Sequence, residues 1–268
     1  MLRDITLGQY HPGDSCVHRL DPRAKLLLTI AYITSVFLVK DAPAYLLPMG
    51  YLLLVTRLAR IPLRYLLKGV RPLAMILVLT FVLHIFFTRG DTLWLRLGPV
   101  RLTQEGFNTA LFFSLRLVLL VMGTSVLTLT TSPVALTDAM ERLLSPLRAI
   151  RFPAHELAMM MSIALRFIPT LLEETDKIMK AQMARGADFE SGNLIRRAKA
   201  MVPLLVPLFV GAFQRASDLA MAMEARCYRG GEHRTRMKVL RFSYLDGMAA
   251  LSMLALVLLI VGEGMLRG

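Results

Sequence analysis

The residue types that carry catalysis and metal binding are sparse in this sequence. The two cysteines, Cys16 and Cys227, have neither CxxC nor Cys/His metal spacing, and the five histidines are scattered. No GxxxxGK[ST] phosphate loop, GxSxG motif, HExxH motif or EF-hand loop is present. The sequence therefore predicts a protein that is not an enzyme and has no catalytic residue, metal ligand or cofactor.

One dense group of carboxylates, Glu173, Glu174 and Asp176, leaves an alternative open. A membrane-embedded enzyme acting on lipid would need clustered polar residues of this kind. Lysine follows four residues after Glu173 and after Asp176, however, a spacing that favours ion pairs on one exposed face of a helix. We therefore interpret the cluster as a solvated helix face.

Arginine occurs in two similar segments, AQMARGA at 181–187 and AMEARCYRG at 222–230. Each segment places Ala-Arg at the end of a predicted amphipathic helix, where the helix dipole favours a cation. One such ending is an ordinary helix terminus, but two of them, some forty residues apart, suggest paired contacts with a partner that has two similar grooves. A small residue allows close approach, and the guanidinium can bind a carboxylate through two hydrogen bonds. The candidate docking residues are Ala184, Arg185, Gly186, Ala225, Arg226 and Cys227.

The two segments differ at the position after arginine. Gly186 accepts the left-handed conformation that commonly ends a helix, whereas a cysteine adopts it only at a cost. We therefore expect the second helix to continue past Cys227 and to end at Gly230-Gly231. The two docking ends would then differ in geometry.

Composition indicates a membrane protein. The chain has 268 residues, mean hydropathy +0.55, 55% hydrophobic residues and a net charge of +13, which together suit apolar crossings joined by basic loops. Nucleic-acid binding is the other common explanation of such a charge. The most basic block, 133–243, has 17 basic but also 11 acidic residues and few aromatic residues for base stacking, so we expect no nucleic-acid partner.

Apolar runs predict an all-α integral membrane protein with about five crossings. Asp21-Pro22 should begin the first helix, and Lys25 should extend its side chain to the membrane surface. Arg116 should face the bundle interior, against carbonyls or a carboxylate. A basic amphipathic surface helix is expected over 57–71, and a small extracellular β-hairpin over 92–103 with Trp94 at the interface. The predicted crossings are 26–39, 44–58, 72–87, 106–131 and 244–261.

The block 133–243 predicts three long amphipathic helices, over 133–153, 154–185 and 193–225. Pro169 should bend the second helix, and the apolar stretch 200–213 of the third is itself a possible crossing. The predicted domains are 1–132, 133–243 and 244–268. With this arrangement 26 of the 32 Lys and Arg residues lie on one side, which places the N-terminus and the block 133–243 in the cytosol of a multi-pass cell-membrane protein.

Several short segments of the sequence resemble those of a known family. They are GQYHPGDS at 8–15, HRLDPRAKL at 18–26, the stretch 127–133, Ala184-Arg185-Gly186 and Ala225-Arg226. Together they resemble the T component (EcfT) of energy-coupling factor ABC transporters, and the resemblance runs nearly end to end. The second motif departs from the family at Cys227, where glycine is usual.

The resemblance implies a function and a set of partners. A T component is a roughly L-shaped membrane protein that joins two cytosolic ATP-binding subunits to a substrate-binding S component in the lipid bilayer, for uptake of vitamins or metal ions. It binds no small-molecule substrate itself. Arg185 and Arg226 would dock into grooves of the two ATPases, with Ala184, Gly186 and Ala225 allowing close approach.

Overall fold

We describe a computed structural model, in which residues 10–39, 43–88, 93–97, 100–146, 152–189, 193–230 and 240–267 are placed. The chain divides into two compact units, which we treat separately. The larger unit comprises residues 8–139 and 239–268, and the smaller unit comprises residues 140–238 with 1–7. The boundary between residues 139 and 140 lies inside helix α7 (Pro133–Leu144). The three domains expected from the sequence remain a prediction.

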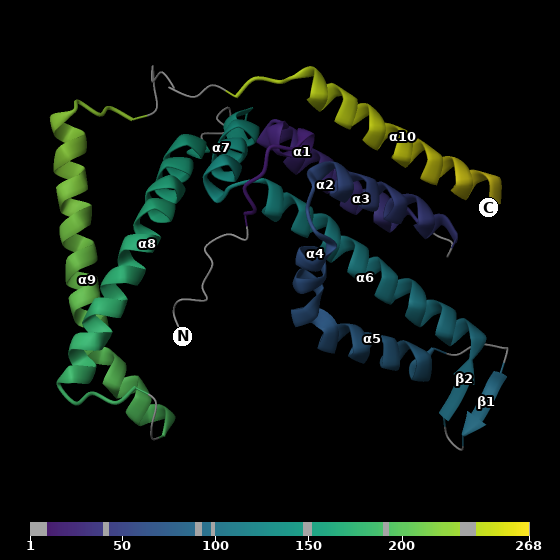
Figure 1. The fold of residues 1–268 in the computed structure, drawn as a ribbon, viewed down its shortest axis with the longest axis horizontal. Helices are drawn as coiled ribbons and strands as arrows, with labels where there is room; N and C mark the ends of the chain where they lie inside the picture. Colours follow the sequence, from purple (N-terminus) through teal and green to yellow (C-terminus); the bar gives the residue numbers. More distant parts are fainter. Residues whose placement is uncertain are drawn as a thin grey trace. The chain divides into compact units, whose positions relative to one another are not determined.

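The larger unit is built almost entirely from helices (Figure 1). Two short 3-10 helices, Pro43–Tyr45 and Arg71–Leu73, precede α3 and α5, respectively. The other elements are α1 (Cys16–Arg19), α2 (Pro22–Leu38), α3 (Leu46–Ala59), α4 (Leu63–Val70), α5 (Ala74–Phe87), β1 (Leu93–Leu97), β2 (Val100–Thr103), α6 (Gln104–Thr130) and α10 (Tyr244–Arg267).

The start of α2 confirms the predicted cap and corrects the predicted position of Lys25. Asp21 is the N-cap and accepts a hydrogen bond from the Arg23 backbone N–H at 2.9 Å, and Pro22 is the first helical residue. The Lys25 side chain is buried, and its Nζ donates to the carbonyls of His18 at 3.1 Å and Thr130 at 2.9 Å. Lys25 does not extend to the surface because these carbonyls, one of them at the open C-terminal end of α6, lie within its reach.

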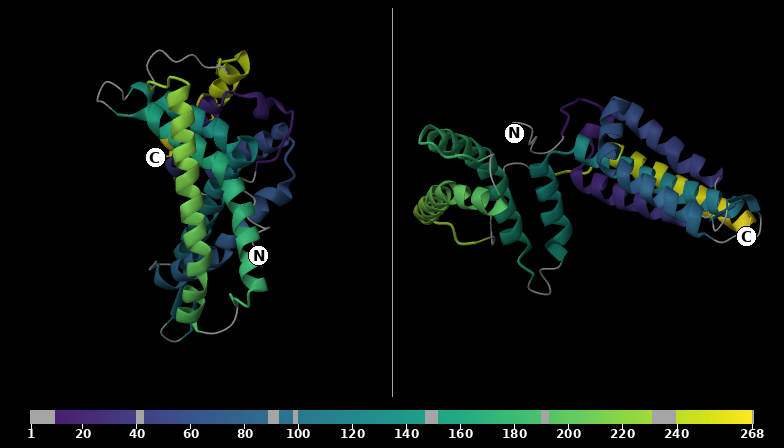
Figure 2. Two further views of the ribbon diagram at one scale, coloured as in Figure 1. Left: turned by 90° about the vertical axis from the view of Figure 1, so that its left-hand side faces the viewer. Right: turned by 90° about the horizontal axis from the view of Figure 1, so that it is seen from below.

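Helices α2, α3, α6 and α10 pack side by side around the core of this unit (Figures 1 and 2). Tyr32, Val36, Leu52, Leu119 and Met253 are among the buried residues that they contribute. Close packing drives helix association in lipid, where apolar side chains gain little by leaving hydrocarbon. The contact of Gly123 with the Tyr32 ring illustrates it, since a Cβ at Gly123 would lie 2.4 Å from that ring.

Arg116 lies where the sequence predicted, turned towards neighbouring helices. Its Nε donates to Tyr45 Oη at 2.9 Å, and one terminal nitrogen donates to the Val39 carbonyl at 3.1 Å. The rings of Phe37, Phe112 and Phe113 lie 5.0–5.6 Å from the guanidinium carbon. These contacts confirm that Arg116 faces the bundle interior and pairs with a carbonyl, and the aromatic rings add cation–π contacts.

The basic surface helix expected over 57–71 is not continuous. Helix α3 ends at Ala59, Arg60 adopts a left-handed conformation with φ +55°, and α4 starts after Pro62. Pro62 explains the interruption, because the residue before a proline is disfavoured in helical conformation and proline itself has no N–H to donate. Arg57 therefore lies on a different helix from Arg64 and Lys68.

The predicted hairpin region contains two antiparallel strands, β1 and β2, with Leu97 opposite Val100. The pairing shifts by one residue between Leu93 and Leu95. The turn residues Gly98 and Pro99 and the Trp94 side chain lie outside the described residues, so the interfacial position of Trp94 remains a prediction.

The smaller unit contains the end of α7, helix α8 (Ala154–Ala184) and helix α9 (Leu194–Ala225). The helix expected to reach residue 153 ends at Leu144 instead, because Ser145 precedes Pro146 and is disfavoured in a helix. Helix α8 continues through Pro169. Helix α9 starts within one residue of the expected position, and Figure 1 shows it changing direction in its first half, which contains Pro203 and Pro207.

In the part of the chain that the structure describes, five helical stretches are long and apolar enough to cross a membrane, which confirms an all-α membrane protein but changes the set of candidates. Helix α2 has 17 residues and is shorter than a typical crossing, as is the segment Pro43–Ala59. Two helices expected in the cytosol qualify by length and composition. The five are Leu63–Phe87, Gln104–Thr130, Ala154–Ala184, Ala198–Ala225 and Tyr244–Met265.

Candidate functional site

The C-terminal end of α8 is closed by a Schellman motif, in which two hydrogen bonds run backwards to the last helical turn. The Gly186 N–H donates to the Met183 carbonyl at 3.0 Å, and the Ala187 N–H donates to the Gln182 carbonyl at 3.0 Å. Gly186 has φ +86°, which this motif requires of the residue after the cap. Arg185 is the cap residue itself, so its position is fixed by the backbone.

The C-terminal end of α9 has the same hydrogen-bond pattern. The Cys227 N–H donates to the Glu224 carbonyl at 2.9 Å, the Tyr228 N–H donates to the Met223 carbonyl at 3.0 Å, and Arg226 is the cap. Cys227 has φ +55°. The prediction that this helix runs on to Gly230-Gly231 is therefore wrong. Gly230 lies beyond the end of the helix, and Gly231 lies outside the described residues.

Cysteine adopts the left-handed conformation here because the cap compensates for it. A single left-handed residue other than glycine costs about 1–2 kcal/mol. Each hydrogen bond that closes the helix contributes about 0.5–1.5 kcal/mol, and there are two of them. The two helix ends therefore share one backbone geometry, contrary to the expectation that they differ. What distinguishes them is the thiol at Cys227, where Gly186 has no side chain.

All six candidate docking residues, Ala184 to Gly186 and Ala225 to Cys227, are exposed. Neither Arg185 nor Arg226 has an ion-pair partner among the described residues. Each arginine therefore places a solvated cation at the negative end of a helix dipole, an arrangement suited to binding a carboxylate. The described residues contain no group of three or more His, Cys, Asp or Glu side chains that could hold a metal ion.

The structure does not bring Arg185 and Arg226, which we call the arginine tips of α8 and α9, close together. Helices α8 and α9 pack against each other and are joined by the short segment 185–193, so α9 begins near the end of α8. Figure 1 shows Arg185's end of α8 and Arg226's end of α9 at opposite ends of this pair. The two arginine tips, which share one backbone cap geometry, therefore lie at opposite ends of the α8–α9 pair.

An ion pair that the sequence did not predict joins the two helices. Glu174 of α8 accepts a hydrogen bond from Arg215 of α9, and both side chains are about 30% exposed. A Cβ at Gly211 would lie 3.2 Å from the Glu174 carboxylate, so glycine makes room for this contact. Neither expected pair, Glu173 with Lys177 or Asp176 with Lys180, is formed in this stretch of α8, all of which the structure describes. In the sequence, the isolated Arg215 within the alanine-rich segment 212–222 could have indicated a contact with another helix.

A similar contact fixes the start of α8. His155 Nδ1 lies 2.9 Å from a Glu141 carboxylate oxygen, with both side chains about 10% exposed, and so links α7 to α8. The sequence offered no signal for this pair beyond the presence of the two residue types. Both contacts stabilise the helices that carry the arginine tips.

Comparison with known proteins gives the family of the chain. Residues 13–237 match the family model described as cobalt transport protein, CbiQ. The chain is 58% identical to the energy-coupling factor transporter transmembrane protein EcfT of Thermosediminibacter oceani over 99% of both sequences. It is 54% identical to the protein of that name from Acidaminococcus fermentans, over 97% of both sequences, and 48% identical to the one from Bacillus subtilis, over 97% of this chain and 98% of that protein. The chain therefore belongs to the CbiQ cobalt transport protein family, and along almost its whole length it is similar to proteins named energy-coupling factor transporter transmembrane protein EcfT.

Proposed function

We propose that the chain is the energy-coupling transmembrane subunit of an ECF-type ABC importer. In this role it links two cytosolic ATP-binding subunits to an S component in the membrane that binds the imported vitamin or metal ion. The observation that carries the proposal is the pair of exposed arginine tips with the same Schellman cap. The proposed role requires no catalysis and no substrate site in this chain.

Each tip suits docking into a groove that carries a carboxylate. The helix ends at the cap, so the arginine is the outermost residue of the helix rather than one position along its side. The preceding Ala184 or Ala225 leaves space for the walls of a groove. Two tips of one geometry suit two ATP-binding subunits of one fold, and movement of these subunits towards each other would then displace α8 and α9.

The proposal requires α8 and α9 to lie in the cytosol, although both are long and apolar enough to cross a membrane. If the helix pair spanned the bilayer, its opposite ends would lie on opposite sides, and only one arginine could reach a cytosolic partner. Glu173, Glu174 and Asp176 would also place three carboxylates in the second half of α8, which is costly in hydrocarbon. The N-terminus is then cytosolic as well, in agreement with the distribution of Lys and Arg.

The test is to replace Arg185 and Arg226 by alanine, singly and together, in the transporter complex. We expect each single variant to lower substrate uptake by about tenfold or more, because a charged hydrogen bond across an interface is worth about 1.5–3 kcal/mol. The double variant should lose the ATP-binding subunits on co-purification. Arg241→Ala, at an exposed arginine outside both helix-end segments of the sequence, is the matched control. Uptake near the wild-type rate in the double variant would refute the docking role.

A further inference from the structure

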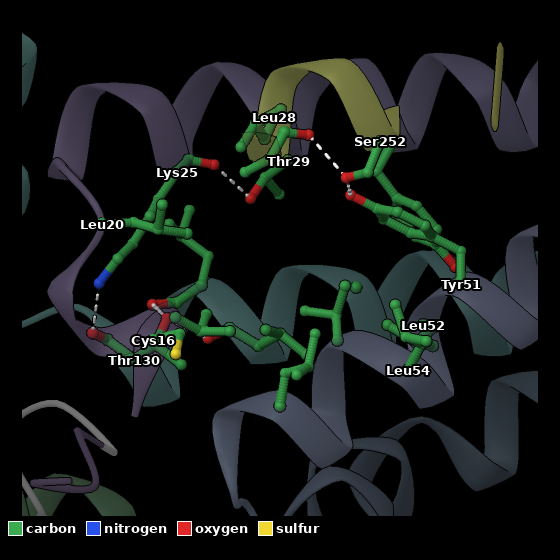
Figure 3. A pocket seen from close by; sticks show the side chains of 18 of the residues that line it. Cys16, Leu20, Lys25, Leu28, Thr29, Tyr51, Leu52, Leu54, Thr130 and Ser252 are labelled. Carbon is green, nitrogen blue, oxygen red and sulfur yellow. Dashed lines mark hydrogen bonds between the residues drawn. The ribbon is translucent and has the colours of Figure 1, made fainter. Parts of the chain in front are cut away.

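The larger unit contains a groove of about 370 Å³ between α2, α3, α6 and α10 (Figure 3). This volume is at the lower end of the range of pockets that enclose a small ligand, about 300–1,000 Å³. The groove is lined along its length by apolar side chains, among them Leu28, Leu52, Val55 and Val126. The contact of Tyr32 with Gly123 lies on its inner wall.

Polar side chains lie at both ends of the groove, with Thr29 between them. Figure 3 shows Lys25, Cys16 and Thr130 at one end, and Tyr51 and Ser252 at the other. The Tyr51 and Ser252 hydroxyls are 3.4 Å apart and contact each other. A ligand that matches this pattern has a long apolar part and a polar group at the end where Lys25 lies.

A buried ammonium lies at the Lys25 end of the groove, with the carboxylates of Asp21 and Asp246 nearby. Lys25 is 6% exposed, and its ammonium has three protons, of which the His18 and Thr130 carbonyls accept two. The two nearby carboxylates are already engaged. Asp21 pairs with Arg23 at 2.9 Å, and Asp246 accepts the backbone N–H groups of Asp21 at 2.8 Å and Ser243 at 2.7 Å.

Exposed arginines add to the charge at the same end. The groove is lined there by Leu58 in the last turn of α3, and by the first turn of α10. Arg57 and Arg60 end α3, Arg19 ends α1, and α1 packs on α3; all three arginines are exposed. An anionic group would therefore meet a buried ammonium with a proton to donate and a basic rim.

We propose that this groove binds one acyl chain of an anionic membrane phospholipid, with the phosphate of its headgroup near Lys25 and the basic rim. Basic pockets between membrane helices on the cytosolic side bind anionic headgroups in this way. The side chains of Leu54 and Met248, which are more than half exposed, border the groove and would meet lipid hydrocarbon. The S component is the competing occupant, but an apolar partner helix would not make use of the charge.

The test uses the full transporter complex in vesicles, with phosphatidylglycerol or phosphatidylcholine that carries a photoreactive group in its acyl chain. We expect phosphatidylglycerol to label groove peptides containing Leu28, Val55 or Leu127 several-fold more than phosphatidylcholine. Thr29→Phe, which fills the groove, should remove most of this labelling. Ile30→Phe is its matched control, because Ile30 is the next residue of α2 and does not line the groove.

The headgroup is tested separately, with exposed residues that the fold does not require. Arg57→Gln together with Arg19→Gln should reduce the preference for phosphatidylglycerol at least threefold, whereas Arg64→Gln on α4 should leave it unchanged. Equal labelling by the two lipids in the wild type would overturn the proposal, as would unchanged labelling in Thr29→Phe. Labelling of the S component without labelling of these groove peptides would overturn it as well.

Discussion

At the scale of single residues, Cys227 shows how a helix end can keep its geometry without the expected glycine. Its backbone has φ +55°, and the same two cap bonds are formed as at Gly186 with φ +86°. The Cβ atom of Cys227 makes this backbone conformation costly, and the two cap bonds outweigh that cost. The backbone of the second helix end is therefore equivalent to that of the first. A substitution at Cys227 should be able to stabilise the second end.

This cost predicts opposite effects of two substitutions at equivalent positions. Cys227→Gly should stabilise its helix end by up to about 1 kcal/mol, because glycine has no Cβ to strain at positive φ. Gly186→Ala should destabilise its end by about 1 kcal/mol for the same reason. Thermal unfolding of the purified complex measures both, with an increase in Tm for the first and a decrease for the second. A decrease in Tm for Cys227→Gly would contradict the shared geometry.

Residue types predicted many local features but could not choose between contacts that depend on the fold. Asp21-Pro22 identified the start of α2, and the depth of Arg116 in an apolar run predicted its inward orientation. The burial of Lys25 could not be foreseen, because the carbonyl of Thr130 that it binds is 105 residues away. The left-handed Cys227 was missed because its intrinsic cost was weighed without the two cap bonds.

At the scale of elements, the contact of Glu174 with Arg215 stabilises the packing of α8 against α9. Among the described residues it is the ion pair that joins these two helices directly, and each partner lies about three turns before the arginine tip of its own helix. A coupling device has to transmit displacement between its ends, which requires that the two helices move together. The lengths and most boundaries of α8 and α9 could be predicted from the sequence. The ion pair could not be predicted, because it depends on how the two helices cross.

Reversing the two charges tests this role. Glu174→Arg and Arg215→Glu should each reduce substrate uptake several-fold, because each places like charges together at the crossing. The double variant should recover much of the wild-type uptake, since it restores an opposite pair. Glu173→Lys is the matched control, because Glu173 is exposed on the next position of α8 and has no ion pair there. Additive losses in the double variant would argue against a direct coupling of the two residues.

At the scale of the whole molecule, hydropathy alone does not determine which helices cross the membrane. Among the described residues, the helices that qualify by length include α8 and α9, whereas α2 and α3, which contribute much of the core of the larger unit, are shorter than a usual crossing. The predicted membrane class is confirmed, but the assignment of individual crossings depends on charge and partners as well as on length. The two arginine tips lie at opposite ends of the α8–α9 pair, and this placement bears on whether these helices cross the membrane. Both tips can contact cytosolic subunits only if the helix pair lies outside the bilayer.

The central claim is that both helix tips contact cytosolic ATP-binding subunits, and site-specific photo-cross-linking tests it most directly. A photoreactive amino acid at Asp188, beside the first tip, and at Arg229, beside the second, leaves the docking arginines unchanged. In intact membranes containing the complex, we expect cross-links from each position to an ATP-binding subunit, and none from the exposed control position Leu251 of α10. Cross-links to ATP-binding subunits from only one tip, or from neither, would contradict the account.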